Sequence, residues 1–394
     1  MTLPFVLYTY LAAEILAPTF AAFIILSCVL FLGKIIPLLD ILLDFGVNLP
    51  DFIRLCAYIA PQLSLFSMPM ACMMGVIIGL TRLGTDGEIM ALKACGIGSY
   101  RMLPPVLIIA LTAALLTGLI TVHLLPDSKI ARQQLLFQLA KQKIDKGMRE
   151  KQFSDAIGNV VLYADRIDED TGAWHGVYVT DMRDKKNPIV VMARHGSLSA
   201  NIEKMLLSLV LGDGSLHRVQ DDITQTIRFD NYLLNLSLPN PTGIPVQKTD
   251  KGKLSLAQLR QQARSADILP EKRAALLMEY HKRLALPVGC FILTLLGFPL
   301  GFLSGPGRRS AGLPLGLGLF IAYYVLTTAA KAVGESLILP VAPAIWTPNI
   351  LFSLLMFYLI RSGANETAAV HLDKGRQLIE KITQRLPGTR KNNL

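Results

Sequence analysis

Six windows of about 20 predominantly apolar residues divide the chain, and each is long enough to cross the hydrocarbon core of a bilayer as a helix. They lie at about residues 11–33, 56–80, 102–124, 284–303, 313–330 and 346–360. Prolines inside these windows are tolerated because neighbouring helices can satisfy the carbonyls that proline frees. The pattern predicts a polytopic α-helical membrane protein with six transmembrane helices.

Between the third and fourth windows, residues 125–278 change to the two-residue alternation of β-strands. Ile227 and Phe229, for example, alternate with Thr226 and Arg228, which is typical of a strand with one buried face. We expect strands at 160–168, 176–183, 189–200, 205–219 and 224–236, with a turn at Gly212-Asp213-Gly214. The insert is thus predicted to be all-β, as an antiparallel sandwich or a jellyroll-like roll.

Helical periodicity flanks this β-domain on both sides. Residues 128–145 are predicted to form an amphipathic helix that leaves the membrane, and residues 255–265 a short helix on the return. A further helix from residue 271 is expected to run straight into the fourth span. The insert is therefore linked to the third and fourth spans by helices.

The positive charges give the orientation. Of 394 residues 52% are apolar and only 17% charged, which excludes a simple water-soluble enzyme, and the net charge is +10. Basic residues gather in the loop 81–101, at Arg308 and Arg309, and in the tail 363–394. With six spans these segments share one side, which the positive-inside rule makes the cytoplasm. Both termini are then cytoplasmic and the β-domain lies on the opposite side.

The same distribution argues against nucleic acid as a partner. Residues 125–280 hold 22 basic and 19 acidic side chains, a difference of only +3, so most of the charge belongs to the membrane part and its tail. All five cysteines fall in the spans or the loop 81–101, and none in the β-domain. A disulfide framework is therefore excluded there, and the sheet must be stabilised by its own core.

Motifs for catalysis, cofactors and metals are missing. The sequence contains no G-x-x-x-x-G-K-[ST], H-E-x-x-H, G-x-S-x-G or C-x-x-C. The glycine-rich stretch 301–312 is interpreted as a cytoplasmic turn because no strand precedes it and no Ser/Thr-capped helix follows. We expect a chain with no catalytic residues, no cofactor and no metal.

The loop 84–99 is the most informative short segment. Thr85 and Glu88 have the spacing of a capping box, ahead of a short helix at 89–95 that Gly96 and Gly98 would end. One interpretation is a capped interfacial turn. The other is a cytoplasmic helix that docks on a partner protein, to which Asp86 and Glu88 offer negative charge.

Two further groups have alternative interpretations. Lys34, Arg54 and Arg283 lie at the outer edge of the membrane, with Glu279 and Lys282 beside the last; they either anchor the helices by snorkelling or bind an anionic lipid headgroup. The strand 206–211 is apolar on both faces except at Ser208. Leu207 and Leu209 then belong either to a buried strand or to a wall that accepts acyl chains.

Several motifs together resemble a known family. They are Asp86-x-Glu88 followed by Ala94-x-Gly96, Glu279-x-His281-x-Arg283 before the fourth span, and Phe298-Pro299-Leu300-Gly301 near its end. With six spans and a β-insert, the chain to about residue 362 resembles the lipopolysaccharide-export ABC transporter permeases, the YjgP/YjgQ or LptF/LptG family. Met148-Arg149-Glu150 and the stretch 211–219 are more similar to the F-type partner.

The resemblance implies a permease subunit of the bacterial inner membrane with a periplasmic jellyroll domain. It implies a heterodimer with a paralogous permease, a cytoplasmic ATPase dimer that hydrolyses the ATP, and a periplasmic bridge protein of the jellyroll type that receives lipopolysaccharide. Thr85, Asp86 and Glu88 would couple to the ATPase. Lys34, Arg54 and Arg283 would contact the substrate headgroup, and Leu207 and Leu209 its acyl chains.

The implied domain organisation is residues 1–124 with the first three spans and the coupling loop 81–101, 125–278 as the β-domain, 279–362 with the last three spans, and 363–394 as a basic cytoplasmic tail. Two other functions stay open. One is a permease for another lipid or for lipoproteins. The other is a membrane-anchored receptor or scaffold whose β-domain binds a periplasmic protein.

Overall fold

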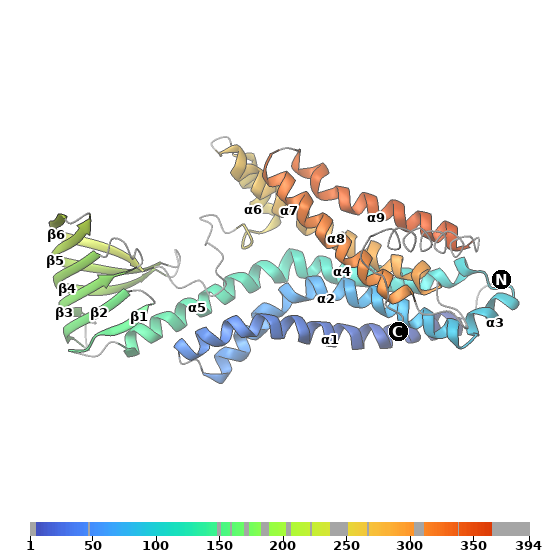
Figure 1. Ribbon diagram of the computed structural model, residues 1–394, viewed down its shortest axis with the longest axis horizontal. Coiled ribbons are helices and arrows are strands. Elements are labelled where there is room, and N and C mark those ends of the chain that lie inside the picture. Colours follow the sequence, from blue (N-terminus) through green and yellow to red (C-terminus); the bar gives the residue numbers. More distant parts are fainter. Residues whose placement is uncertain are drawn as a thin grey trace, which may run out of the picture. The chain divides into compact units, whose positions relative to one another are not determined.

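The structure is a computed structural model. It describes residues 5–45, 48–147, 151–157, 160–168, 173–182, 189–201, 206–220, 223–236, 251–265, 268–302, 311–337 and 339–364. The chain forms two compact units, which we describe separately (Figure 1). A helical unit comprises the described parts of Met1–Leu32, Ala60–Asp127 and Lys251–Leu394, and a second unit comprises those of Gly33–Ile59 and Ser128–Asp250.

Six helices of the described chain are long and apolar enough to cross a membrane, which confirms the six expected spans. The long helices are α1 (Phe5–Phe45), α2 (Leu49–Thr85), α4 (Leu103–Leu119), α5 (Leu125–Gly147), α7 (Pro270–Gly301), α8 (Gly312–Glu335) and α9 (Val341–Ala364). Short helical segments are α3 (Glu88–Ala94), a 3₁₀ turn (Ser99–Met102) and α6 (Leu256–Arg264). A π-helical turn, Ile120–Leu124, joins α4 to α5 into one long segment.

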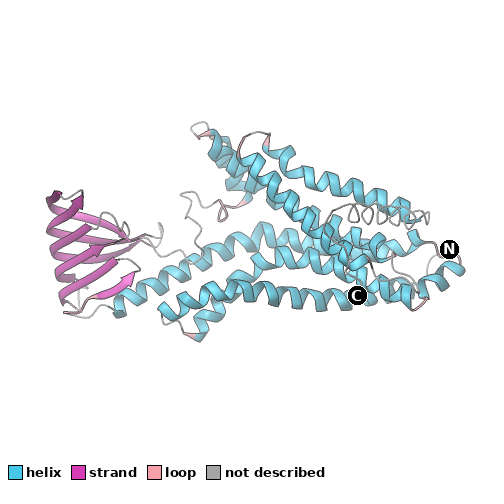
Figure 2. Ribbon diagram, viewed as in Figure 1, coloured by secondary structure: helices cyan, strands magenta, loops and turns pink. Residues whose placement is uncertain are grey.

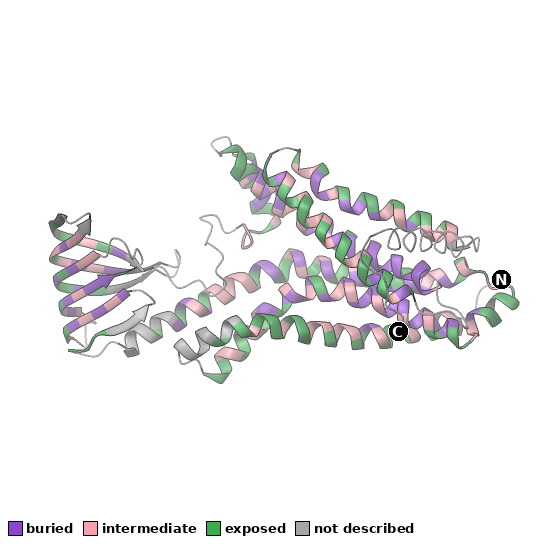
Figure 3. Cartoon of the chain, in the orientation of Figure 1, coloured by how far each residue is buried: buried purple, intermediate pink, exposed green. Residues whose placement is uncertain are grey.

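Helices α2 and α7 form the interior of the helical unit. In the most apolar window of each, 67% and 72% of the residues are buried, against 11% in α1 and in α8 (Figure 3). Close approach of α7 to α2 requires a small residue, because a methyl group on Gly297 would lie 2.8 Å from the Met73 carbonyl oxygen. The apolar faces of α1 and α8 are left for lipid or for another membrane helix to cover.

The segment that leads from the β-domain back to the fourth span contains the two helices that the sequence predicts. Helix α6 begins with a capping box, in which the Ser255 hydroxyl accepts a hydrogen bond from the Gln258 amide and the Gln258 side chain accepts one from the Ser255 amide. Helix α7 then begins at Pro270 and continues without a break to Gly301, so the helix expected from residue 271 does run into the fourth span.

The β-domain contains one sheet of six described strands (Figure 2). They are β1 (Ser154–Ile157), β2 (Val160–Ile167), β3 (Ala173–Asp181), β4 (Ile189–Asn201), β5 (Leu206–Gln220) and β6 (Ile223–Leu236). Each strand pairs antiparallel with the next, in the order β1-β2-β3-β4-β5-β6. This confirms the fold class of a helical membrane protein with an inserted β-domain, and adds β1 to the five expected strands.

One face of the sheet carries its core. The buried side chains include Leu162, Val177, Val191 and Leu209, and Phe137 of α5 packs with them. Because no cysteine occurs between residues 125 and 278, apolar burial and the backbone ladder are what hold this domain together.

The expected turn at Gly212-Asp213-Gly214 is wrong. Strand β5 runs through these residues, and Gly212 and Gly214 pair with Asn231 and Phe229 of β6. Gly214 is needed for packing, because a side chain there would collide with the Phe229 ring and with the Met192 carbonyl. Pairing on both sides of β5 outweighs the local turn preference of the three residues.

Candidate functional site

The loop between α2 and α3 differs from the sequence prediction at its first turn. Helix α2 includes Thr85, whose hydroxyl donates a hydrogen bond to the Arg82 carbonyl (2.8 Å), and α3 has no side-chain cap. The capping box of Thr85 and Glu88 is therefore wrong. The prediction fails because α2 extends through Thr85, which is therefore not a cap residue. Gly87, with a φ of 77°, then makes the turn into α3.

Glu88 instead contacts the first transmembrane helix. The Tyr10 hydroxyl of α1 lies 2.9 Å from Oε2 and 3.1 Å from Oε1 of Glu88 and donates to the carboxylate. This charge-assisted hydrogen bond joins the start of α3 to α1, across 78 residues of sequence.

A second contact joins the end of α2 to α1. Arg82 Nη1 lies 3.4 Å from Oε2 of Glu14, and Arg82 Nε lies 3.9 Å from Oδ2 of Asp86. We call Tyr10, Glu14, Arg82, Asp86 and Glu88 the loop cluster. It contains both acidic residues that the sequence singled out and attaches their loop to α1 at two points.

The sequence interpretation missed the α1 half of the loop cluster. Tyr10 and Glu14 are four residues apart and therefore lie on one face of α1. The available signal was Glu14 itself, since a carboxylate inside an apolar window is costly unless it has a partner or a function.

Helix α3 is anchored on one side and open on the other. Ile89 is buried in the core of the helical unit, whereas the next residue, Met90, is 64% exposed. Ala91, Ala94 and Cys95 are exposed as well. Among the described residues, α3 thus presents a short surface of small and apolar side chains, together with the exposed Lys93, next to the carboxylates of the loop cluster.

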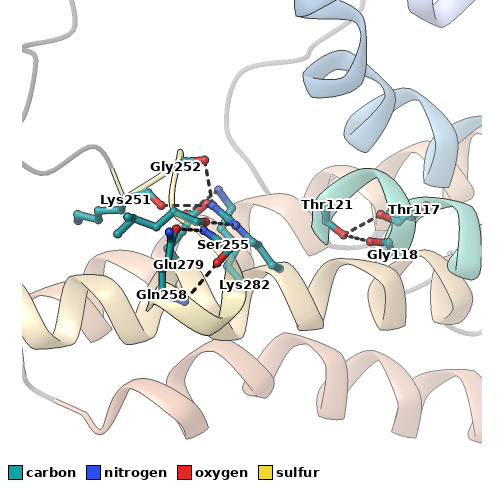
Figure 4. Close-up of polar contacts among 11 residues, drawn as sticks. Thr117, Gly118, Thr121, Lys251, Gly252, Ser255, Gln258, Glu279 and Lys282 are labelled. Atoms are coloured by element: carbon teal, nitrogen blue, oxygen red, sulfur yellow. Dashed lines mark hydrogen bonds and ion pairs between the residues drawn. The ribbon is translucent and has the colours of Figure 1, made fainter. Parts of the chain in front are cut away.

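Arg283 of α7 is enclosed by its own chain. Its side chain is 1% exposed, and Nε lies 3.2 Å from Oε1 of Glu279, one helical turn earlier. The guanidinium also donates to three backbone carbonyls, those of Leu254 (2.7 Å), Lys251 (3.2 Å) and Gly252 (3.0 Å). Figure 4 shows Lys251, Gly252 and Glu279 close together.

These contacts give Arg283 a structural task. A buried guanidinium is stable when it is paired and its donors are satisfied, and here it ties residues 251–254 to α7. Sequence spacing shows only the pairing with Glu279 four residues earlier, because the other acceptors are backbone carbonyls. The exposed neighbour Lys282 lies at 4.0 Å from the same carboxylate.

The other two basic candidates are exposed and belong to the second compact unit. Lys34 lies in the last third of α1, near the end of the span Phe5–Ile36, and is exposed. Arg54 of α2 is 66% exposed, with Nη1 at 3.5 Å from Oδ1 of Asp51. Arg283 belongs to the helical unit, so the structure does not bring the three cations together within one unit.

The two leucine candidates lie on β5. Leu209 is fully buried in the core face of the sheet. The backbone of Leu207 pairs with Leu236, while its side chain lies outside the described part of the chain. Three other segments singled out in the sequence lie outside the described residues: Met148-Arg149-Glu150, Arg308 with Arg309, and the tail from residue 365.

An apolar groove of about 580 Å³ lies between α4, the π-helical turn and α7. Its lining includes Leu115, Gly118, His123, Pro287 and Phe291. The Thr121 hydroxyl donates to the carbonyls of Thr117 and Gly118 at the widened turn (Figure 4). The Thr117 hydroxyl donates to the Ala113 carbonyl one turn earlier. No sequence signal indicated this turn, because a π-helical turn depends on how neighbouring helices pack.

Comparison with known proteins gives a match over nearly the whole chain. The family model of "Lipopolysaccharide export system permease LptF/LptG" matches residues 9–362. The lipopolysaccharide export system permease protein LptF of Escherichia coli (strain K12) is 22% identical over 361 residues, which are 90% of this chain and 94% of that protein. An uncharacterized protein of Rickettsia prowazekii (strain Madrid E), RP871, is 26% identical over 310 residues, which are 77% of this chain and 83% of that protein.

Proposed function

The chain belongs to the lipopolysaccharide export system permease LptF/LptG family, and on this premise we propose that it is the permease subunit of an ABC transporter. This transporter extracts lipopolysaccharide from the bacterial inner membrane and passes it through the β-domain toward the outer membrane. The observation that carries the proposal is the family match over residues 9–362, which includes all six spans and the whole inserted sheet.

ATP hydrolysis is assigned to a separate chain. The sequence has no P-loop, and the exposed side of α3 with Met90 gives a cytoplasmic ATPase dimer a surface on which to dock. In this proposal Asp86 and Glu88 face basic residues of the ATPase, and Thr85 ends the helix that leads to them. The loop is the coupling element of the transporter.

The loop cluster gives this coupling a physical route. A displacement of α3 acts on α1 through the Tyr10–Glu88 hydrogen bond, and a displacement of the end of α2 acts on it through Arg82 and Glu14. Helix α1 is one of the two least buried spans of the described chain. Although Leu11 and Ile15 of α1 pack in the core of the helical unit, less of α1 than of α2 or α7 is held by packing when α3 moves.

The substrate is recognised by charge and by apolar surface. Lys34 and Arg54 are exposed cations suited to charge-assisted hydrogen bonds with headgroup phosphates. Arg283, whose donors are engaged within the chain, supports the substrate path by holding residues 251–254 on α7. Leu209 forms part of the wall that acyl chains meet along the core face of the sheet, and we propose the same role for Leu207 from the sequence alone.

The partners follow from the same proposal. A paralogous permease covers the exposed spans α1 and α8 in a heterodimer, and a periplasmic bridge protein of the jellyroll type receives lipopolysaccharide from the β-domain. Both termini and the loop cluster lie in the cytoplasm, and the sheet lies in the periplasm. The basic loop 81–101 supports this orientation.

Affinity purification of the full-length chain from its bacterial membrane tests the proposal. We expect an ATPase subunit and a second permease to copurify, and mass spectrometry to identify lipopolysaccharide as the bound lipid. A different lipid would point to another lipid or lipoprotein exporter. Purification with a periplasmic protein but without any ATPase would favour a receptor or scaffold.

A further inference from the structure

The backbone ladder of the sheet skips one residue on each of five adjacent strands, always at the same level. Regular pairs flank the skipped position, for example Ala164 with Val177 and Arg166 with His175. The five unpaired residues, all described and all exposed, are Asp165, Gly176, Arg194, Asp213 and Asp230. Gly176 and Asp213 have positive φ values of 61° and 52°.

The skipped residue reverses the face on which the next side chains lie. In a regular strand, residues two apart share a face. Here Val177 is buried in the core while His175, two residues before it, is half-buried, and Ala193 is buried while His195, two residues after it, is exposed. The two histidines are directly opposite each other in the β3–β4 register. Two imidazoles are thereby placed together on the face that does not carry the core.

Their geometry is that of two ligands of one ion. The Nδ1 atoms of His175 and His195 are 3.2 Å apart, with ring centroids at 5.1 Å and ring planes at 83°. Zinc binds imidazole nitrogen at about 2.0–2.1 Å with tetrahedral geometry, which separates two nitrogen ligands by roughly 3.3–3.4 Å. The observed separation differs from that value by about 0.2 Å at most.

We propose that His175 and His195 bind a divalent transition metal of the Zn²⁺ class across strands β3 and β4. Both Nδ1 atoms are ligands, and water completes the coordination. Among the described residues, no group of three or more histidine, cysteine or acidic side chains could hold a metal, so this site rests on two protein ligands. It is independent of the proposed transport function.

The metal-free pair is consistent with this role. The Nδ1 atoms are at hydrogen-bond distance, with the donor set by the tautomer. When both rings carry their hydrogen on Nε2, both Nδ1 lone pairs are available to a metal. Because the pair lies on the exposed face, the ion reaches it without opening the sheet. Bound metal would link β3 to β4 beside the row where the ladder is interrupted.

Neighbouring charges are mixed in sign. Arg166 lies opposite His175 in the β2–β3 register, and Arg194 precedes His195. Asp165 lies against Gly176, where a side chain would collide with the aspartate Cβ at 2.9 Å. All three charged side chains are exposed, so solvent and salt screen their effect on a bound cation.

A third histidine on the same sheet provides a matched control. His217 Nε2 lies 3.0 Å from the Ser215 hydroxyl, and its Nδ1 lies 3.0 Å from the Thr226 hydroxyl. Both ring nitrogens are thus engaged with hydroxyl groups. Substitution of His217 should therefore leave metal binding unchanged.

The test is a Zn²⁺ titration of the full-length chain in detergent by isothermal titration calorimetry, after removal of metal with a chelator. We expect one saturable equivalent per chain, with binding at least about tenfold weaker in His175→Gln and in His195→Gln and unchanged in His217→Gln. Circular dichroism on each variant verifies the sheet.

Two results would overturn the metal site. One is the absence of saturable Zn²⁺ binding by the wild-type chain. The other is unchanged affinity in both His175→Gln and His195→Gln, which would assign the ion to other groups such as the exposed thiols of Cys28 and Cys95. If one of the two variants does not fold, the other decides the question alone.

Discussion

Replacement of Arg283 by methionine should destabilise the helical unit more than any other single change of a charged residue discussed above. The variant keeps most of the buried side-chain volume and removes the guanidinium with its hydrogen bonds to Glu279 and to three backbone carbonyls. Glu279, 15% exposed, loses the partner that is closest to it. Removal of one partner of a buried ion pair typically lowers the free energy of unfolding by about 3–5 kcal/mol.

The matched control is Lys282→Met, one residue away. Lys282 is 38% exposed and only 4.0 Å from the same carboxylate, so its loss should lower the free energy of unfolding by about 1 kcal/mol or less. A double variant, Arg283→Met with Glu279→Gln, should recover part of the loss because no unpaired charge remains.

The assay is chemical or thermal unfolding of the purified full-length variants in detergent, followed by tryptophan fluorescence. Similar stability of Arg283→Met and Lys282→Met would show that the Arg283 contacts do not stabilise the helical unit. It would mean that water satisfies the carbonyls of the 251–254 segment as well as the guanidinium does.

Three further predictions concern the loop cluster, helix packing and the substrate. Tyr10→Phe should lower ATP-driven lipopolysaccharide export and leave membrane insertion intact, because it removes only the hydroxyl bound to Glu88; wild-type export would contradict the route through α1. Gly297→Ala should lower the free energy of unfolding by about 1–3 kcal/mol through overpacking, whereas Gly318→Ala, with open space around it, should not; thermal unfolding compares them. Lys34→Ala should weaken lipopolysaccharide crosslinking, and unchanged crosslinking would leave this lysine a membrane anchor.

The elements with strong periodicity could be predicted from the sequence. Six apolar windows gave the spans, and two-residue alternation gave five of the strands. The short helix on the return and the continuous helix into the fourth span were also predicted from local residues alone. These features depend on interactions within one element, which short sequence windows contain.

The errors arose where distant segments decide the local structure. Gly212-Asp213-Gly214 has turn residues, yet pairing on both sides keeps it in β5. Thr85 has a cap residue's spacing, yet α2 extends through it. The Tyr10 partner of Glu88 and the backbone carbonyls bound by Arg283 lie 78 and about 30 positions away in the sequence, so only the tertiary structure could identify them.

The decisive measurement is ATP-dependent extraction of lipopolysaccharide from membranes that contain the assembled transporter. We expect extraction by the wild-type chain and its loss in Glu88→Arg, which reverses the charge at the start of α3 and breaks the contact with Tyr10 while membrane insertion is retained. Full extraction by Glu88→Arg, or none by the wild-type chain with its ATPase, would contradict it.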